Sequence, residues 1–420
     1  MTISSTRVSN RRQRAAHERT VLALLTGGDA AQMLSVALAH RGIVRSWNVH
    51  AIHHRPGAGV SVGYSVVLDH NDDGCVRRTD TYVVATSGRI NEDRLDEVDG
   101  RTVTWRNVRV HVWEHPYDPE LPALELACNP DQLDDWLGRE TDTELIAYRP
   151  TRRAVVRIDD VDGGAVHWAK VMRPDQIDGI VTRLRMLERA GTPAPVVQDV
   201  DPRGLIVTTD LSGLALNKVY ARVEPQHIET MRGVLDSLAA TLDSLPMVAI
   251  GLPARPAWAD RCEHYAEAAV TVLPQEEQRI RDLTRQIRHE LDHADLGPLV
   301  PTHGDFYEAN IFVDPRTGYV SGILDVDSLG PGYRVHDWGC LLGHMSVLPG
   351  LAPQTYQHID PLLADWTQRV ARWVDPQALG ASAAGVVLSL VAGARRSRKR
   401  NWQAEALFRI EVAEKWLSQR

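Results

Sequence analysis

The sequence predicts an α+β protein, with a β-rich N-terminal part and a mostly helical C-terminal part. Three observations support this fold class. Short strands separated by turn signals come first, helical stripes dominate the rest of the chain, and one irregular polar segment, residues 301–344, interrupts the helices. At 420 residues the chain is longer than one hydrophobic core usually serves, so we expect two or three packed units.

The first elements follow from local patterns. Residues 1–18 are polar and rich in arginine, so we expect them to be disordered, and residues 29–40 have the apolar spacing of a helix. Alternating polarity and turn residues then predict strands over 49–54, 60–68 and 81–86, with a loop over 70–78.

A second set of three strands repeats this arrangement, over 144–150, 154–158 and 166–171. Each set has an Arg-Pro pair near the turn between its first two strands. Each also has an alanine in its third strand, directly before Thr86 in the first set and Lys170 in the second. The repetition indicates an internal duplication. The copies differ chemically, because Lys170 of the second set has Thr86 as its counterpart in the first.

The remaining elements are mostly helical. An apolar stripe predicts a helix over residues 175–189, and residues 204–209 form a strand. Further helices are predicted over 225–245, 257–272, 274–294, 361–373 and from 377 to the end.

Composition excludes several classes of protein. The formal net charge of -8 gives no broad positive field, so we expect no nucleic-acid partner and no anionic membrane surface. No segment is apolar for long enough to predict a membrane span, and the four cysteines lack the paired spacing of a disulfide framework or a zinc ribbon. We therefore expect reduced thiols and a cytoplasmic location.

The irregular segment carries the pattern with the clearest chemistry. His303-Gly304-Asp305 precedes Asn310 at the start of one short strand, and Asp325 follows the next strand after a tight turn. Phosphoryl transfer needs a carboxylate that orients the acceptor hydroxyl and takes its proton, together with oxygen ligands for Mg²⁺. Asp305 fits the first role, and Asn310 and Asp325 fit the second.

This pattern resembles the catalytic and metal-binding loops of the aminoglycoside phosphotransferases and their sugar and choline kinase relatives. The resemblance implies a bilobal, protein-kinase-like fold and a small-molecule kinase that uses ATP and Mg²⁺. It implies that Asp305 is the catalytic aspartate, with His303 of the same motif counted among the catalytic residues. It also implies that Asn310 and Asp325 bind Mg²⁺, and that Asp337 braces the catalytic loop.

The same resemblance implies a nucleotide site in the β-rich part. Lys170, the only lysine in the first 217 residues, would contact the phosphates, with Asp178 or Glu188 as its acidic partner. Arg152 and Arg153 lie in the turn that replaces a glycine-rich loop, so phosphate contacts there would come from arginine side chains and backbone N–H groups.

Thr209, Asp210 and Leu211 resemble the hinge whose backbone pairs with adenine; a plain strand-to-helix connection is the alternative. These features predict a cap domain over residues 19–138, similar to a degenerate N-lobe and to the added N-terminal unit of maltokinase and glucosamine kinase relatives. A kinase-like N-lobe and hinge follow over 139–213, and a helical C-lobe over 214–420.

The predicted acceptor is a hydroxyl of an aminoglycoside, an amino sugar, a sugar or a related antibiotic. Five acidic residues are candidates for binding an amino group, or simply face water: Asp260, Glu263, Glu267, Glu276 and Glu277. A catalytically silent nucleotide-binding or scaffold protein is the alternative function. A protein kinase is disfavoured because about a dozen residues separate Asp325 from Asp337, too few for an activation loop. No P-loop motif occurs.

Overall fold

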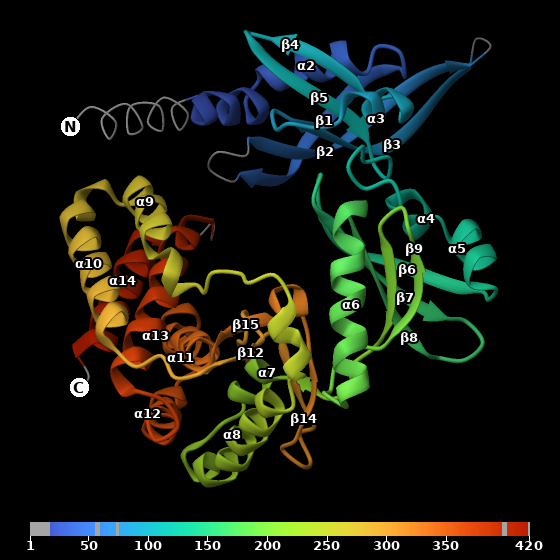
Figure 1. The fold of residues 1–420 in the computed structure, drawn as a ribbon. Coiled ribbons are helices and arrows are strands. Elements are labelled where there is room, and N and C mark those ends of the chain that lie inside the picture. Colours follow the sequence, from blue (N-terminus) through green and yellow to red (C-terminus); the bar gives the residue numbers. More distant parts are fainter. Residues whose placement is uncertain (1–16, 55–58, 73–74, 397–400, 419–420) are drawn as a thin grey trace. The chain divides into compact units, whose positions relative to one another are not determined.

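The structure, a computed structural model, describes residues 17–54, 59–72, 75–396 and 401–418 (Figure 1). It divides into two compact units. The first contains Met1–Asp178 and Val197–Thr209, and the second contains Gly179–Val196 and Asp210–Arg420. Of the N-terminal residues expected to be disordered, 1–16 lie outside the described residues, whereas 17 and 18 begin a helix, His17–Thr26.

The first unit contains two five-stranded antiparallel sheets. The first sheet has the order β1-β2-β3-β5-β4, from β1 (Ile43–His54), β2 (Val60–Asp72), β3 (Cys75–Thr86), β4 (Arg101–Trp105) and β5 (Val108–Glu114). The helix His17–Thr26 and α2 (Asp29–Ala37) share one apolar core with this sheet. The hydroxyl of Tyr64 donates a hydrogen bond to the Leu25 carbonyl at 2.6 Å, which ties the first helix to β2.

The loop predicted over residues 70–78 is wrong. Strands β2 and β3 continue as a ladder on both sides of residues 73–74, with Asp72 opposite Cys75. A buried carboxylate accounts for the extension, because Asp69 accepts hydrogen bonds from Arg45 of β1 at 2.5 Å and from Arg78 of β3 at 2.9 Å. Arg78, which lay in the predicted loop, is thus joined through Asp69 of β2 to Arg45 of β1.

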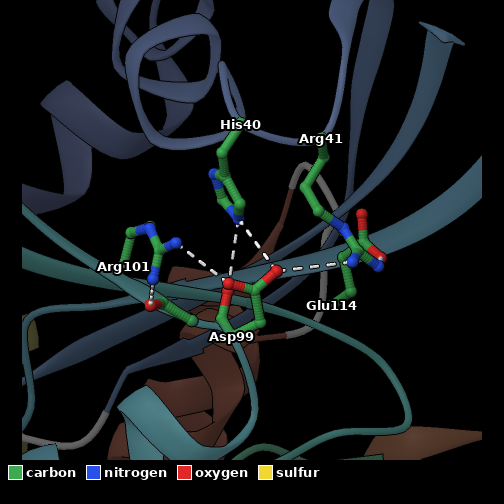
Figure 2. A network of polar contacts seen from close by, with 6 residues as sticks. His40, Arg41, Asp99, Arg101 and Glu114 are labelled. Atoms are coloured by element: carbon green, nitrogen blue, oxygen red, sulfur yellow. Dashed lines mark hydrogen bonds and ion pairs between the residues drawn. The ribbon is translucent and has the colours of Figure 1, made fainter.

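A polar network lies where α2 ends and β4 begins (Figure 2). Asp99 is at its centre and is within ion-pair distance of His40 at 3.4 Å, Arg41 at 3.4 Å and Arg101 at 2.9 Å. Arg41 also donates to Glu114 at 2.6 Å. Such exposed pairs contribute up to about 1 kcal/mol each, so we assign the network to holding the helix end against the sheet.

The second sheet has the order β6-β7-β8-β10-β9, from β6 (Thr141–Arg149), β7 (Arg153–Asp160), β8 (Val166–Met172), β9 (Val197–Asp201) and β10 (Leu205–Thr209). The strand order matches that of the first sheet. A helix follows the third strand in each case, α3 (Glu92–Glu97) in the first and α6 (Pro174–Ala190) in the second. This shared topology supports the internal duplication. Helices α4 (Leu124–Cys128) and α5 (Pro130–Leu137) share the core of the second sheet.

The second unit carries the irregular segment on two small sheets. One contains β11 (Leu214–Ala215), β13 (Ile311–Val313) and β14 (Val320–Ile323), and the other pairs β12 (Leu299–Thr302) with β15 (Gly330–Tyr333). The helices are α7 (Leu216–Tyr220), α8 (Ile228–Asp243), α9 (Cys262–Val272), α10 (Glu277–His293), α11 (Arg334–Leu351), α12 (Ile359–Val370), α13 (Pro376–Val391) and α14 (Trp402–Ser418).

Helix α11 corrects the boundary of the irregular segment, which was expected to continue to residue 344. The helix begins at Arg334, directly after β15. The sequence pattern did not predict this helix for two reasons. It contains three glycines and Pro349, and most of its residues are buried, so no polar face alternates with an apolar one. The glycines have a packing reason, since a Cβ at Gly339 would lie 2.5 Å from the Ser382 side chain of α13.

Helix α13 corrects the expectation that no segment approaches a membrane span. Among the described residues, the stretch Pro376–Arg395 is long and apolar enough by composition, and a bent pair near the N-terminus passes only if counted as one span. However, 72% of the apolar window of Pro376–Arg395 is buried inside the structure. Helices α11 and α14 pack against α13, so its apolar sequence fits a core helix.

Candidate active site

The catalytic motif begins where β12 ends. Thr302 pairs with Gly330 of β15, and Gly304 then turns the chain with a φ of +79°. A Cβ at position 304 would lie 2.8 Å from the Cβ of Ser328 and 3.0 Å from its carbonyl oxygen. Glycine is therefore required here for two reasons, the left-handed backbone and the close approach of the segment that follows Asp325.

Asp337 holds the backbone of this turn. Its Oδ2 accepts a hydrogen bond from the N–H of His303 at 3.0 Å, and its Oδ1 accepts one from the N–H of Gly304 at 2.9 Å. The carboxylate is 1% exposed, and Arg334, one helical turn earlier, lies 3.5 Å away. Asp337 thus occupies the position expected of a residue that braces the loop.

His303 links the two halves of the site. It is completely buried, and its Nε2 lies 2.9 Å from the Leu324 carbonyl, which can only accept, so Nε2 carries the proton. Its Nδ1 then accepts a hydrogen bond from the Asp305 N–H at 3.3 Å. Burial lowers the pKa of His303 and favours this neutral form. Both nitrogens are used within the loop, so the imidazole fixes Asp305 relative to Leu324.

Asn310 lies directly beside Asp305. Its Nδ2 donates to the Asp305 carbonyl at 3.0 Å and approaches the Asp305 Oδ2 at 3.4 Å. Its backbone carbonyl accepts from the N–H of Leu324 at 2.7 Å, which places Asn310 next to the residue that precedes Asp325. Asp325 itself has left-handed backbone angles, φ 53° and ψ 49°, a conformation that Asp tolerates better than most residues.

These donors fit a magnesium ion. The amide nitrogen of Asn310 is directed to Asp305, which leaves its Oδ1 as the ligand atom, and Asp325 adds a carboxylate. Within the described residues, no group of three or more His, Cys, Asp or Glu side chains is arranged to hold a metal. Two protein ligands suit Mg²⁺, because this ion usually completes its shell with phosphate oxygens and water.

Burial and the Asp325 charge together raise the pKa of the Asp305 carboxyl to about 6. Asn310, Trp258 and Arg261 act in the opposite direction. Trp258 and Arg261 were missed by sequence reasoning, because they lie more than forty residues before the motif and no local spacing relates them to it. Only the fold brings them to Asp305.

Glu308 is a second residue that sequence reasoning missed. It is 6% exposed, and its Oε2 has no hydrogen-bond partner among the described residues. Burial and the nearby Asp305 raise the pKa of its carboxyl to about 7. Its position between Asp305 and Asn310 could have marked it as a candidate site residue. It is a carboxyl inside the motif to which neither proton transfer nor metal binding had been assigned.

Residues 137–382 match the family model described as APH, phosphotransferase enzyme family. The chain belongs to this family. The match covers more than half of the sequence and contains every residue predicted for the site. It confirms the family predicted from the catalytic motif, whereas the closer likeness to maltokinase and glucosamine kinase stays a prediction.

Individual relatives of the phosphotransferase chain were compared by sequence and by structure. An aminoglycoside 3'-phosphotransferase of Streptomyces fradiae is 30% identical over 168 residues, which are 38% of this chain and 62% of that protein. The chain thus spans less than two thirds of the length of this curated relative. A thermostable mutant of aminoglycoside phosphotransferase APH(4)-Ia is 12% identical, with a TM-score of 0.50 over 69% of this chain and 98% of that chain.

The choline kinase LicA of Streptococcus pneumoniae is also 12% identical, with a TM-score of 0.45 over 69% of this chain and 97% of that chain. The APH(4)-Ia match confirms the predicted fold class, an α+β protein of the protein-kinase-like fold. At such low identity the structural matches concern the fold alone.

The residues predicted for a nucleotide site lie on or next to the second sheet and on α6. Lys170 is on β8, and Arg152 lies in the turn that connects β6 to β7. Arg153, which was expected in that turn, is instead the first residue of β7, opposite Arg149 of β6. Asp178 and Glu188 both lie exposed on α6. Their roles stay predictions, as does the choice of acidic partner for Lys170.

The β6–β7 turn is fixed by a buried carboxylate that the sequence did not suggest. Asp118 is 1% exposed and accepts hydrogen bonds from the Tyr148 hydroxyl at 2.7 Å and from the Thr151 N–H at 2.8 Å. Burial raises the pKa of Asp118 to about 6, although these hydrogen bonds lower it. Thr151 has a φ of 63°, so the turn adopts a conformation that its sequence alone does not favour.

The predicted hinge contains the division between the two units, which falls between Thr209 and Asp210. Leu211 covers the β13–β14 hairpin, because a Cβ at Gly322 would lie 2.5 Å from its side chain. The Ser321 hydroxyl donates to the Ser212 carbonyl at 2.6 Å. This segment therefore packs on the hairpin that separates Asn310 from Asp325. Adenine binding by Thr209, Asp210 and Leu211 stays a prediction.

Proposed function

We propose that the chain is an ATP- and Mg²⁺-dependent phosphotransferase that transfers the γ-phosphoryl group to a hydroxyl of a small molecule. One observation carries this proposal. A half-buried carboxylate, Asp305, is held by the backbone and by Asn310 beside a second carboxylate, Asp325, on a loop that Asp337 braces. Membership of the phosphotransferase enzyme family supports it.

In this proposal Asp305 orients the acceptor hydroxyl and takes its proton. The acceptor oxygen forms a bond to the γ-phosphorus, the bond from that phosphorus to the β–γ bridging oxygen breaks, and ADP leaves. Asn310 Oδ1 and the Asp325 carboxylate would hold Mg²⁺, which when bound neutralises charge on the phosphates. Lys170, Arg152 and Arg153 are assigned to phosphate contacts, and residues 209–211 to adenine, by resemblance alone.

The acceptor class takes support from the curated relative, whose name specifies aminoglycoside 3'-phosphotransferase activity. The matched part covers 62% of that relative, so aminoglycosides enter as one acceptor class among several, with amino sugars, sugars and related antibiotics. A silent nucleotide-binding protein is the competing function. The presence of Asp305, Asn310 and Asp325 together beside a braced loop favours the enzyme, because a scaffold has no need of a base next to metal ligands.

A panel of hydroxylated acceptors tests the proposal. Each is incubated with the protein, ATP and Mg²⁺, and mass spectrometry detects a product that carries one added phosphoryl group. The Asp305→Asn variant serves as the matched control. A product formed by the wild type and absent with the variant is the expected result. ATP binding without any product, across the whole panel, would favour the scaffold.

A further inference from the structure

A buried arginine on α6 contacts the segment that follows Asp325. Arg183 is 7% exposed, and its Nε donates a hydrogen bond to the Leu329 carbonyl at 2.9 Å. Its Nη1 donates to the Gly179 carbonyl, one helical turn earlier, at 2.8 Å. A Cβ at residue 179 would lie 3.2 Å from this Nη1, so the glycine leaves room for the guanidinium. Arg183, Gly179 and Leu329 all belong to the second unit.

The positive charge of Arg183 is costly at this buried position. No ion pair joins it to a carboxylate among the residues that the structure describes, and its hydrogen bonds go to backbone carbonyls. An apolar side chain of similar length would fill the same space without the cost of removing a charge from water, so packing alone does not explain an arginine here. The contact that an apolar side chain could not make is the hydrogen bond to Leu329.

Leu329 ends the short turn that begins at Asp325. Asp325 directly precedes the 3₁₀-helix η5 (Val326–Ser328), and the Leu329 N–H donates to the Val326 carbonyl at 3.0 Å. The next residue begins β15. Because a single 3₁₀ turn separates Asp325 from Leu329, the hydrogen bond from Arg183 restrains the backbone that carries the Asp325 carboxylate.

The same turn also contacts the catalytic loop. Ser328 lies against Gly304, where a Cβ would come within 2.8 Å of the Ser328 Cβ and 3.0 Å of its carbonyl oxygen. Asp305 follows Gly304 directly. The segment from Asp325 to Leu329 therefore carries one site residue at its start and packs on the turn that presents another, and Arg183 fixes its end to α6.

We propose that Arg183 is a positioning residue for the metal site, and that its hydrogen bond to Leu329 holds this turn in the conformation that presents the Asp325 carboxylate to Mg²⁺. The inference rests on the proposed function in one respect, the assignment of Asp325 as a magnesium ligand. Loss of a residue that orients a metal ligand typically costs about 10–100-fold in metal affinity. Arginine suits this role better than lysine, because its planar guanidinium donates to Leu329 and Gly179 at once.

Two measurements on Arg183→Met test the inference, and neither depends on catalysis. Without ligands, hydrogen exchange of the backbone over residues 324–330 should be faster than in the wild type, because the Leu329 carbonyl loses its donor. In thermal melts with a non-hydrolysable ATP analogue, the Mg²⁺ concentration that gives half of the additional shift should rise about tenfold. The shift caused by the analogue alone should stay the same.

Arg183→Lys keeps the charge but not the planar guanidinium. It should change both measurements in the same direction as Arg183→Met, by a smaller amount. It also replaces Arg183→Met in both measurements if the methionine variant does not fold. Arg185→Met is the matched control, since Arg185 is exposed on the same helix, and it should leave both measurements unchanged.

An unchanged Mg²⁺ dependence in Arg183→Met would overturn the inference, whatever the variant's stability, because the arginine would then have a structural role alone. A wild type that shows no additional shift with Mg²⁺ would overturn it too, even if a product forms. Failure of the proposed function gives a different result. In that case no acceptor yields an Asp305-dependent product, while the Mg²⁺ shift and its dependence on Arg183 persist, and the inference stands.

Discussion

The carboxylate of Asp337 receives the N–H of Gly304 at 2.9 Å, across 33 residues of sequence. The same carboxylate receives the adjacent N–H of His303 at 3.0 Å. Two consecutive backbone donors thus converge on one buried anion. This arrangement holds the turn that presents Asp305, and it leads to the first prediction.

Asp337→Asn should destabilise the protein by roughly 2–3 kcal/mol, because a buried hydrogen bond to a charged acceptor is lost and the new NH₂ group faces a donor. Denaturant unfolding measures the change. Activity should fall as well, since the backbone of His303 and Gly304 loses its anchor. Asp360→Asn, at an exposed position of α12, should change stability by less than about 0.5 kcal/mol. Equal stability of the two variants would contradict the bracing role.

Gly304→Ala should cost more than about 1 kcal/mol and reduce activity, because residue 304 has a φ of +79° and its new Cβ would meet Ser328. Adding Ser328→Gly removes the Cβ contact at 2.8 Å but leaves the carbonyl contact at 3.0 Å and the backbone strain. The double variant should therefore recover only part of the loss in melting temperature. Full recovery would show that backbone strain is unimportant here.

Asp305→Asn should lower kcat by about 10²–10⁴ while the affinity for Mg²⁺–ATP stays within a few-fold of normal. The amide keeps the shape of the side chain and removes the base. Asp325→Asn should differ, because the loss of a metal ligand weakens nucleotide binding and turnover together. Steady-state kinetics and nucleotide titrations separate the two patterns. If Asp305→Asn lost nucleotide binding as severely as Asp325→Asn, the assigned roles would be wrong.

Mg²⁺ and ATP together should raise the melting temperature more than ATP alone, because Asn310 and Asp325 bind the metal that the phosphates share. Thermal melts of the wild type with and without Mg²⁺ measure this difference. In the Asp325→Asn variant the extra shift from Mg²⁺ should shrink. Identical shifts with and without Mg²⁺ in the wild type would remove the metal assignment.

Asp118 should make stability depend on pH. Its folded pKa of about 6 lies above the ordinary value of 3.8, so the folded state binds the proton more tightly than the unfolded state. As pH rises from 4 to 7 the charged form is buried at a cost, and the wild type should lose roughly 2 kcal/mol relative to Asp118→Asn. Denaturant unfolding of both proteins at several pH values gives the difference.

Asp131→Asn, at an exposed site of α5, is the matched control for that series. The stability difference between the wild type and Asp118→Asn could instead stay constant from pH 4 to 7, or grow in favour of the wild type. Either result would show that the buried carboxyl is charged throughout this range.

The sequence alone was sufficient to predict a strand or helix wherever apolar residues recur at the spacing typical of that element. Strands β6, β7, β8 and β10 of the second sheet and helix α6 lie within a few residues of their predicted positions, because alternation and a helical stripe are local properties. Strand β9 of the same sheet was not predicted. The catalytic motif was equally readable, since Asp305, Asn310 and Asp325 lie on one short stretch and their chemistry needs those residue types.

Where the residues that contact each other are far apart in the sequence, only the tertiary structure decided the local conformation and the surroundings of the site. Residues 70–72 and 75–78 form strands because Asp69 joins Arg45 and Arg78 across three strands. Helix α11 keeps its glycines because Gly339 and Gly343 pack closely on α13, and Gly350 packs on Phe408 of α14. Trp258 and Arg261 reach Asp305 from more than forty residues away, and Asp118 fixes a turn at Thr151. The sequence determined which groups do the chemistry. Burial and long-range hydrogen bonds, which have no sequence period, decided their surroundings and pKa values.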